Sequence, residues 1–503
     1  MARMERPTST PVRLVELIEG VQWAGEPVPT DLMITGVTLD SRAVRAGELF
    51  AALPGHVRHG ADFAAGAVSS GAVAILTDAA GLEQCAGLGV PVLVIDNPRA
   101  HLGQLAANAH GRPADSLTML GITGTNGKTT VTHLLDAALV SAGHRTGVIG
   151  TVGISIAGTH HAGSRTTPES TDLHELLSAM RQRDVDAVSM EVSSHAMSEH
   201  RVDGVLFDVV GFTNLTQDHL DYHGTMEGYF LAKAELFTPE HARRAVIGVD
   251  DEWGARLAAS CPIEHVTWSA EGHPADWSVS PTARGITITG PEERCEIDFR
   301  LPGAFNRANA VCAFAMLRSI GVPAADIARS WADIAVPGRM EDVSAGYEMR
   351  VLVDYAHTPD AVERALVAAR DGMNGEGRLI AVIGAGGDRD RGKRPEMGAL
   401  AARLADAVWI TDDNPRSEDP AAIRAAVREG VMTVPGDVRA DVRETGDRAL
   451  AIHEAIASAR SGDVVAILGK GHESGQDVAG IITDFDDRAV ARAALADTHG
   501  AST

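Results

Sequence analysis

The sequence lacks long apolar runs, a cysteine pattern and an excess of basic charge. No run approaches the ~20 apolar residues of a membrane span, and the opening segment MARMERPTST has no apolar signal-peptide core. We therefore expect a cytoplasmic protein without membrane insertion. The cysteines are scattered without metal-ligand or redox spacing, so we interpret them as reduced, buried thiols. They are Cys85, Cys261, Cys295 and Cys312.

Basic residues are too few to balance the acidic ones. The chain has 44 Lys and Arg against 68 Asp and Glu, a formal net charge of −24. This balance argues against nucleic acid or an anionic membrane as the main partner, so any bound phosphate must be held by a local site. The 45% of hydrophobic residues and 22% of charged residues are typical of a globular protein.

The length of the chain predicts several domains. A chain of 503 residues exceeds what one hydrophobic core normally organises. Strand-like and helix-like stretches alternate throughout, which predicts an α/β protein with parallel sheets. We place three domains at residues 1–112, 113–337 and 338–503. The first is small, and the third is Rossmann-like and doubly wound.

A glycine-rich loop lies between a predicted strand and a predicted helix. Backbone N–H groups and the helix N-terminus can surround phosphate oxygens there, with Lys128 reaching the terminal phosphates and Thr129 offering a hydroxyl to Mg2+. The strict spacing of such loops would need glycine at Ile122, but the chain has Gly121 and Gly124. We predict a P-loop ATPase-like central domain whose ATP site includes Gly124, Thr125, Asn126, Gly127, Lys128, Thr129 and Thr130. The loop leaves open whether the nucleotide drives a motor, a switch or a ligation.

Ten segments resemble the Mur ligase family, in that family's order and over nearly the whole chain. They are TGTNGKTT, EVSSHA, TNLTQDHLDYHG, AKAELF, NRANAVCA, PGRME, DYAHTPD, GAGGDRDRGKRP, DDNPRSEDP and GKGHE. The resemblance implies a three-domain ATP-dependent ligase of peptidoglycan precursor synthesis. ATP phosphorylates a carboxylate to an acyl phosphate, and an amine then displaces the phosphate. Because both partners of the first step are anionic, cations must neutralise their repulsion.

The resemblance also implies Mg2+ ligands. Glu191, at the end of a predicted strand, and His219 are candidates beside Thr129. Each of the two can also be interpreted as a structural polar residue. We interpret His223 as a neighbouring structural histidine. On the residues alone, Lys233 in the apolar run YFLAKAELF would extend to solvent. The resemblance implies instead that CO2 carbamylates Lys233, which then orients a second Mg2+; burial would favour the neutral amine that this reaction requires. The candidate catalytic residues are Lys128, Glu191, His219 and Lys233.

Further nucleotide contacts are implied on either side of the second domain boundary. Asn306 resembles a residue near the adenine, and Arg339 one near the phosphates, although Arg339 can also be read as an interdomain salt bridge. Asp354 and His357, in a strand-end motif of the third domain, resemble residues that approach ATP when the domains close. Closure would exclude water, which hydrolyses an acyl phosphate.

The resemblance assigns a UDP-linked acceptor to the first and central domains. The residues concerned fall into three groups. The first two residues would contact the uracil or ribose, and the following three match a loop on the pyrophosphate side, which can also be interpreted as a solvated loop. The last four match contacts to the muramoyl-peptide. The three groups are Leu39 and Ser41; His56, Val57 and Arg58; and Thr166, Thr167, Ser193 and Arg201. Arg201 suits a substrate carboxylate. Arg165 and Glu199 stand where the family pattern has asparagine and glutamine, which leaves direct substrate contact at both positions open.

The third domain carries candidate contacts to an amino acid, each just after an apolar strand. Arginines can bind its carboxylates through forked hydrogen bonds, and Glu473 can accept from its ammonium. The set is Arg389, Asp413, Asn414, Pro415, Arg416, Gly469 and Glu473. The Asp-Asn-Pro-Arg run resembles the branch of the family that adds meso-diaminopimelate to UDP-N-acetylmuramoyl-L-alanyl-D-glutamate.

Two other functions are compatible with parts of the sequence. A related ligase would add lysine, a dipeptide or, to folate, glutamate; the UDP motif and the Asp-Asn-Pro-Arg run oppose this. A regulatory nucleotide-binding protein would have lost catalytic positions, yet the four catalytic candidates are present. We expect a monomer that uses ATP, the UDP-linked muramoyl-dipeptide and meso-diaminopimelate as partners and Mg2+ as cofactor.

Overall fold

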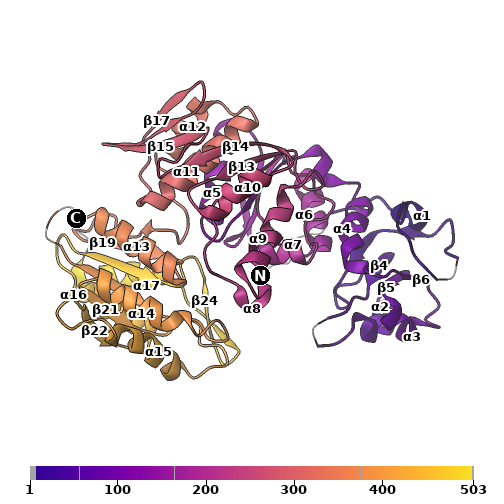
Figure 1. The fold of residues 1–503 in the computed structure, drawn as a ribbon. Helices are drawn as coiled ribbons and strands as arrows, with labels where there is room; N and C mark the ends of the chain where they lie inside the picture. The colour runs from indigo at the N-terminus through magenta and orange to yellow at the C-terminus, as the bar shows by residue number, and fades with distance from the viewer. Residues whose placement is uncertain are drawn as a thin grey trace.

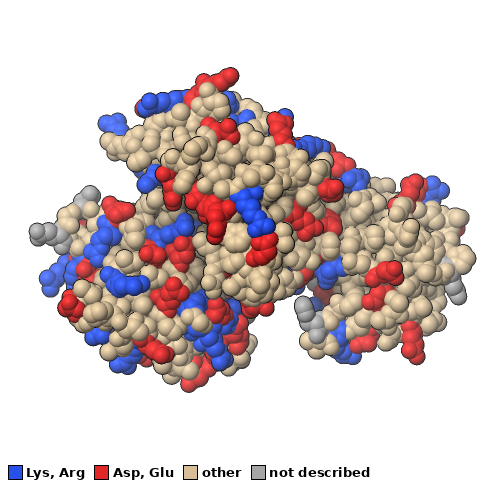
Figure 2. Space-filling model, in the orientation of Figure 1, with Lys and Arg blue, Asp and Glu red and all other residues tan. Residues whose placement is uncertain are grey.

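The structure, a computed structural model, describes residues 7–25, 27–55, 57–163, 165–373, 375 and 377–500. Three sheet-based domains follow one another along the chain, with the central one between the other two (Figure 1). Acidic and basic side chains are interspersed over the visible face of all three (Figure 2). Within the described residues, no helix is both long and apolar enough to cross a membrane.

The first domain is built on a four-stranded parallel sheet of order β3-β4-β5-β6. Its strands are apolar on both faces because both faces are covered. Leu49 and Leu76 pack into one cluster, and Phe50 and Ile75 into another. The elements are β1 (Val12–Arg13), α1 (Leu14–Leu17), β2 (Met33–Ile34), β3 (Gly36–Thr38), β4 (Glu48–Ala51), α2 (Ala64–Ser69), β5 (Ala74–Thr77), α3 (Leu82–Cys85), β6 (Val92–Val94) and α4 (Pro98–Ala109).

The central domain contains an eleven-stranded sheet of order β10-β9-β8-β11-β7-β12-β13-β14-β15-β16-β17. Neighbours from β8 to β15 are parallel, and the outer strands at both edges are antiparallel. Successive residues of β7 face opposite sides: Met119 packs into one core cluster, and Leu120 and Ile122 into the other. The strands are β7 (Thr118–Thr123), β8 (Thr146–Gly150), β9 (Gly153–Ile156), β10 (Thr159–His161), β11 (Ala187–Glu191), β12 (Val209–Phe212), β13 (Arg244–Gly248), β14 (Glu264–Ser269), β15 (Trp277–Thr282), β16 (Gly285–Thr289) and β17 (Arg294–Ile297). The helices are α5 (Lys128–Ser141), α6 (Ser170–Arg181), α7 (Ser194–Ser198), α8 (Leu220–His223), α9 (Met226–Ala234), α10 (Glu252–Ser260), α11 (Ala304–Ser319) and α12 (Ala324–Trp331).

The third domain has a six-stranded sheet of order β18-β19-β23-β20-β21-β22, parallel except at β18. Separate hydrophobic clusters cover its two faces, as in a doubly wound sheet. The predicted α/β class is thus confirmed. The strands are β18 (Glu341–Asp342), β19 (Arg350–Asp354), β20 (Leu379–Ile383), β21 (Ala407–Ile410), β22 (Asp441–Glu444), β23 (Val464–Leu468), β24 (Gly475–Val478) and β25 (Ile481–Asp484). The helices are α13 (Pro359–Asp371), α14 (Lys393–Leu404), α15 (Pro420–Met432), α16 (Arg448–Ser458) and α17 (Asp487–His499).

The carboxyl ends of parallel strands carry the polar residues singled out in the sequence. In the central domain, β7 ends just before the glycine-rich loop and β11 ends at Glu191. In the third domain, β19 ends at Asp354, and β23 ends just before Gly469. Open α/β sheets bind ligands beyond these ends. The fold therefore places both sets of residues at ligand-binding edges.

Candidate active site

The glycine-rich loop has a backbone shape that only glycine accommodates. Gly124 and Gly127 have φ of 144° and 90°. A Cβ on Gly124 would lie 1.9 Å from Thr213 Oγ1, and one on Gly127 would lie 2.2 Å from Asn309 Oδ1. Helix α5 begins at Lys128, so its first N–H groups face the loop. The local fold is that of a phosphate-binding loop.

Lys128 is held inside this loop. Its ammonium donates to the carbonyls of Gly124 and Thr125, each at 2.9 Å. Burial lowers the pKa of Lys128, whereas Glu191 and Asp218 oppose the shift by stabilising the charged form. Two carboxylates therefore help to keep a cation beside the loop.

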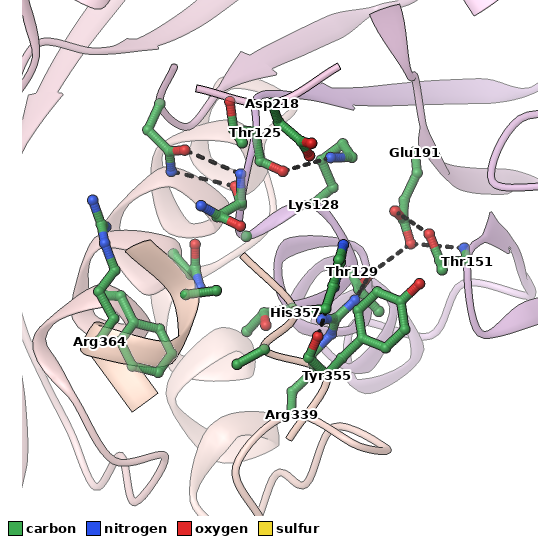
Figure 3. Close-up of a pocket in the computed structure, with 18 of the residues that line it drawn as sticks. Thr125, Lys128, Thr129, Thr151, Glu191, Asp218, Arg339, Tyr355, His357 and Arg364 are labelled. Atoms are coloured by element: carbon green, nitrogen blue, oxygen red, sulfur yellow. Dashed lines mark hydrogen bonds between the residues drawn. The ribbon is translucent and has the colours of Figure 1, made fainter. Parts of the chain in front are cut away.

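A cavity of about 250 Å³ lies between the loop and the third domain (Figure 3). It brings together thirteen of the predicted site residues, from both domains. They are Thr125, Asn126, Gly127, Lys128, Thr129, Thr130, Thr166, Glu191, Ser193, His219, Arg339, Asp354 and His357. Asn306 lies behind this lining: it is buried, donates to Pro302 O at 2.7 Å and accepts from the lining residue Asn309.

Glu191 is the centre of the hydrogen bonds on one wall of the cavity. Its side chain, in a residue only 1% exposed, accepts from Thr129 Oγ1, Thr151 N and Thr151 Oγ1, each at 2.9 Å. Arg339 Nη2 donates to Thr129 Oγ1 at 3.0 Å. Mg2+ takes oxygen ligands, and the adjacent hydroxyl and carboxylate of Thr129 and Glu191 fit it.

Lys233 lies in the interior next to the loop. It is 1% exposed, and its Nζ donates to Gly124 O at 2.9 Å and lies 4.6 Å from the centre of the Tyr229 ring. Burial, and then repulsion from Lys128, lowers the pKa of Lys233 well below its ordinary value. As an ammonium this side chain does not fit a metal site, because it carries a positive charge itself.

The rings of three histidines and two tyrosines pack together beside Lys233; they are His195, His219, His223, Tyr222 and Tyr229. The ring of His195 lies 4.8 Å from that of His219 and 5.4 Å from that of His223. Partial burial lowers the pKa of His219 to about 4, and Asp218 opposes the shift. His223 Nε2 lies 2.9 Å from Ser194 Oγ. Of the residues the structure describes, no three His, Cys, Asp or Glu side chains come together as a metal-binding group.

The third domain contacts the loop directly, in part through residues that the sequence did not single out. Asn126 Nδ2 donates to Asp360 Oδ2 at 2.9 Å, and Arg364 Nε donates to Asp360 Oδ1 at 2.8 Å. The Arg339 guanidinium stacks 4.5 Å from the ring centre of Tyr355. Asp360 is the last residue of the quoted motif DYAHTPD, so that motif could have suggested that Asp360 lies near the loop.

Asp354 and His357 lie beside these contacts, at the end of β19. Asp354 accepts from the backbone N–H groups of Met340 and Ala356, at 2.7 and 2.8 Å. Burial raises the pKa of Asp354 and lowers that of His357. The two hydrogen bonds hold the Asp354 carboxylate at the lining of the cavity.

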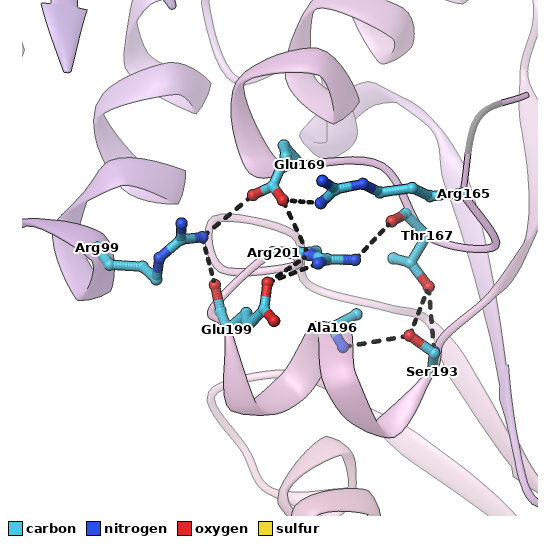
Figure 4. A network of polar contacts seen from close by, with 8 residues as sticks. All are labelled: Arg99, Arg165, Thr167, Glu169, Ser193, Ala196, Glu199 and Arg201. Carbon is cyan, nitrogen blue, oxygen red and sulfur yellow. Dashed lines mark hydrogen bonds and ion pairs between the residues drawn. The ribbon is translucent and has the colours of Figure 1, made fainter. Parts of the chain in front are cut away.

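The predicted muramoyl-peptide residues adjoin Glu191. Thr166 Oγ1 lies 3.0 Å from Thr151 Oγ1, and Thr167 Oγ1 donates to Glu191 O at 2.9 Å. Ser193 caps α7 by accepting from Ala196 N at 3.2 Å (Figure 4). These hydroxyls are therefore tied to the same wall of the cavity.

An ion network surrounds Arg201 (Figure 4). Arg201 pairs with Glu199 at 2.5 Å and with Glu169 at 3.3 Å, and its Nη1 donates to Thr167 O at 3.3 Å. Arg165 also pairs with Glu169. Arg99, on α4 of the first domain, reaches the same Glu169 at 3.1 Å. Arg201 is thus already bound by carboxylates of the chain, and the two positions that depart from the family pattern belong to this network.

The predicted uridine-side residues lie in the first domain, away from the lining of the cavity. Leu39 and Ser41 follow β3 and are half-buried. Val57 is 94% exposed. Arg58 pairs with Asp62 at 3.2 Å. His56 lies outside the described residues.

The predicted amino-acid residues gather beyond β20, β21 and β23. Asn414 Nδ2 donates to Glu473 Oε2 at 2.8 Å. Arg416 has φ of 52°, and its Nη1 donates to Gly387 O at 2.6 Å. A Cβ on Gly469 would lie 2.3 Å from Asp413 Oδ2, which explains the glycine. Pro415 is buried, and Arg389 is exposed, with Nη1 3.3 Å from Asp388 O.

Comparison with known proteins gives matches over all three domains. Residues 33–110 match the Mur ligase family catalytic domain, 122–317 the Mur ligase middle domain, and 338–471 the Mur ligase glutamate ligase domain. A UDP-N-acetylmuramoyl-L-alanyl-D-glutamate–2,6-diaminopimelate ligase of Streptomyces coelicolor is 50% identical over 93% of both chains. One of Corynebacterium glutamicum is 45% identical over 96% of both. A solved structure of a ligase with this name superposes with a TM-score of 0.70 at 30% identity, covering 97% of this chain and 100% of its own.

Proposed function

The chain belongs to the Mur ligase family, and on that premise we propose that it joins meso-2,6-diaminopimelate to UDP-N-acetylmuramoyl-L-alanyl-D-glutamate with consumption of ATP. The observation that carries the proposal is the 50% identity, over 93% of both chains, with a ligase of that name. The proposal is supported by polar residues at the carboxyl ends of strands in two sheets, which line one cavity and its neighbouring loops.

The first step transfers a phosphoryl group to the acceptor carboxylate. A carboxylate oxygen bonds to the γ-phosphorus of ATP, the bond to the β-phosphate oxygen breaks, and ADP leaves. Lys128 and Arg339 offset the negative charge of both partners at this point. Thr129 and Glu191 would hold Mg2+, which neutralises phosphate charge when it is bound.

The second step forms the amide. The amine nitrogen attacks the acyl carbon, phosphate leaves with the electron pair of the broken C–O bond, and the nitrogen loses a proton. Arg416 and Arg389 would bind a carboxylate of the amino acid, and Glu473 its ammonium. The contacts of Asp360 and Arg339 hold the third domain against the loop and limit the access of water to the acyl phosphate.

Lys233 is proposed to act as a carbamate. Its neutral amine would bond the carbon of CO2 and release a proton to solvent, which leaves an anion beside the phosphate loop. That anion suits a second Mg2+, whereas the ammonium does not. The lowered pKa of Lys233 and its burial favour the neutral amine that the reaction needs.

The location and assembly follow from the substrates. ATP and nucleotide-linked sugars are cytoplasmic compounds, so we place the reaction in the cytoplasm. One chain supplies every residue set that the reaction needs, so we propose that the monomer is active. An N-terminal UDP-binding domain, a central ATP-binding domain and a C-terminal amino-acid-binding domain, divided near residues 112 and 337, would account for the three substrates.

The test is a set of candidate amino acids supplied with the UDP-linked muramoyl-dipeptide and ATP. We expect a product of the mass of the meso-diaminopimelate adduct, and phosphate release only when acceptor and amino acid are both present. Lysine lacks one carboxylate and would leave Arg416 without a carboxylate partner, so the kcat/KM for lysine should be lower by roughly 10⁴-fold. Equal use of lysine would contradict the proposed substrate.

A variant locates this selectivity. Arg416→Ala should lower kcat/KM for diaminopimelate while the KM values for ATP and the UDP-linked substrate stay within about twofold, since the lost contact belongs to the amino acid alone. Arg416→Lys should also be poor, because an ammonium cannot make the forked contact. If Arg416→Ala uses diaminopimelate as well as the unaltered enzyme does, Arg416 does not read the substrate.

A further inference from the structure

Lysine is rare in this chain, and its four occurrences share one region. Of the 44 basic residues, four are lysines and forty are arginines. Lys128 and Lys233 adjoin the phosphate loop, Lys393 begins α14 near Asp218 and Asp413, and Lys470 follows β23. At exposed positions either cation serves, so a lysine kept among so many arginines indicates a site that needs a compact ammonium. Lys128 and Lys233 already have proposed roles.

Lys470 is enclosed more completely than the others. Its side chain is 0% exposed, and Nζ donates to Asn414 Oδ1 and to Glu473 Oε2, each at 3.0 Å. Asn414 Nδ2 donates in turn to Glu473 Oε2 at 2.8 Å, which closes a triangle of three side chains. Asp477 N also donates to Asn414 Oδ1 at 3.0 Å.

From this geometry, and on the basis of the proposed function, we propose that Lys470 is a positioning residue that fixes Glu473 and Asn414 for the amino-acid substrate. Both donors hold Oε2 of Glu473, while 31% of that side chain remains exposed. The carboxylate is therefore oriented before the substrate arrives and keeps an accessible surface for an ammonium. Lys470 itself is too deeply buried to touch the substrate.

The backbone on both sides of Lys470 is closely packed against its neighbours. Gly469 and Gly471 flank it with φ of 121° and 54°. A Cβ on Gly469 would lie 2.3 Å from Asp413 Oδ2, and one on Gly471 would lie 2.7 Å from Gly338 O. A guanidinium is larger than an ammonium and planar, so an arginine at this fully buried position would displace its neighbours.

Removal of the Lys470 ammonium should change the KM for diaminopimelate and not the KM values for the other two substrates. In Lys470→Met, Glu473 loses its charged donor and Asn414 loses one partner, so the carboxylate is held by the Asn414 amide alone. A hydrogen bond to a charged group contributes roughly 10- to 100-fold in binding. We expect the KM for diaminopimelate to rise by about tenfold or more, with the KM values for ATP and the UDP-linked substrate within about twofold of the unaltered enzyme.

A double-mutant cycle separates positioning from a general structural role. If Lys470 acts through Glu473, Lys470→Met should raise the KM for diaminopimelate much less in a Glu473→Gln background than in the unaltered enzyme. Arg378→Met is the matched control: Arg378 is a cation of the same domain that pairs with Asp463, at the opposite ends of β20 and β23. It should leave the KM for diaminopimelate unchanged. Lys470→Arg should behave as Lys470→Met does.

The outcomes distinguish this inference from the proposed function. An unaltered enzyme that does not use diaminopimelate overturns the function itself. If the unaltered enzyme uses diaminopimelate, three results for Lys470→Met overturn only the role of Lys470. These are an unchanged KM for diaminopimelate, an equal rise of the KM for all three substrates, and an effect that adds fully to that of Glu473→Gln. If Lys470→Met does not fold, Lys470→Leu, which also removes the donor, takes its place in the same cycle and is judged by the same results.

Discussion

The surroundings of Lys233 determine what its amine can do. The side chain is buried between Gly124 O and the ring of Tyr229, and Lys128 repels a second positive charge there. An ordinary surface lysine is charged at neutral pH and unreactive toward CO2, whereas this lysine has a lowered pKa. The resemblance suggested the modification, and the burial supplies a physical reason for it.

We expect Lys233→Ala to lose activity by about 100-fold or more, because an anion that supports phosphoryl transfer is removed. Short carboxylates such as acetate or formate should restore part of the activity by occupying the vacated space. The measurement is the rate of product formation against carboxylate concentration, with the same concentrations of chloride as the control. Normal turnover of Lys233→Ala, or a loss that no carboxylate relieves, would count against the carbamate.

At the scale of elements, the strand-loop-helix unit of the phosphate loop was predictable from the sequence. The apolar strand, the glycines and Gly-Lys-Thr at the helix start are local signals, and β7 and α5 lie where those signals place them. Thr151 was not predictable. It reaches Glu191 because β8 neighbours β11 in the sheet, and strand order is a property of the packed domain rather than of any local segment.

Strand order also limited what the sequence could predict about the third domain. Lys470 and Glu473 stand in one quoted motif, GKGHE, and Asn414 in another. The sequence predicts that both motifs follow strands, but not that an ammonium joins them, 56 positions apart along the chain. Spacing within a motif is visible in a sequence, whereas the contact between two strand ends requires the fold.

Helix α6 contains a polar group that makes the stability of the fold depend on pH. His174 is 0% exposed, its Nε2 lies 2.9 Å from Asp203 O, and its Nδ1 has no partner among the described residues. Burial lowers the pKa of His174 to about 4. In the unfolded chain His174 takes up a proton as the pH falls through about 6.5, whereas in the folded chain it stays neutral until about pH 4. Above pH 6.5 the histidine is neutral in both states and does not change the free energy of unfolding.

As the pH falls from about 6.5 to about 4, that difference should lower the free energy of unfolding by up to roughly 3 kcal/mol. His174→Gln keeps a donor and cannot be protonated, so it should flatten this part of the profile. The measurement is the urea midpoint at several pH values. His144→Gln, at a half-exposed histidine of the same domain, serves as control. An unchanged slope in His174→Gln would exclude His174 as the cause.

At the scale of the whole molecule, the central domain is linked to each neighbour by a few polar contacts. Arg99 of the first domain pairs with Glu169, and Asp360 of the third accepts from Asn126 in the phosphate loop. The second link joins the phosphate loop to the domain that carries the residues predicted to bind the amino acid. A displacement of the third domain would therefore break a contact of the loop itself.

Asp360→Ala should lower kcat/KM for ATP by about tenfold, since one hydrogen bond to a charged group is worth about 1.5–3 kcal/mol. It should also increase phosphate release without product, because a looser third domain admits water to the acyl phosphate. Steady-state rates and the ratio of phosphate to product measure the two effects. Glu363→Ala, an exposed carboxylate on the same helix, is the matched control. Equal behaviour of the two variants would mean that the Asn126 contact has no functional weight.

The scarcity of lysine has a spectroscopic consequence. Because all four lysines lie at the phosphate loop or near the amino-acid residues, a sample grown with lysine carrying ¹³C at the ε position would give only four side-chain signals. Each signal would report a different part of the reaction centre, without crowding from the surface. One such spectrum, followed as each substrate is added in turn, would record the order in which these parts respond.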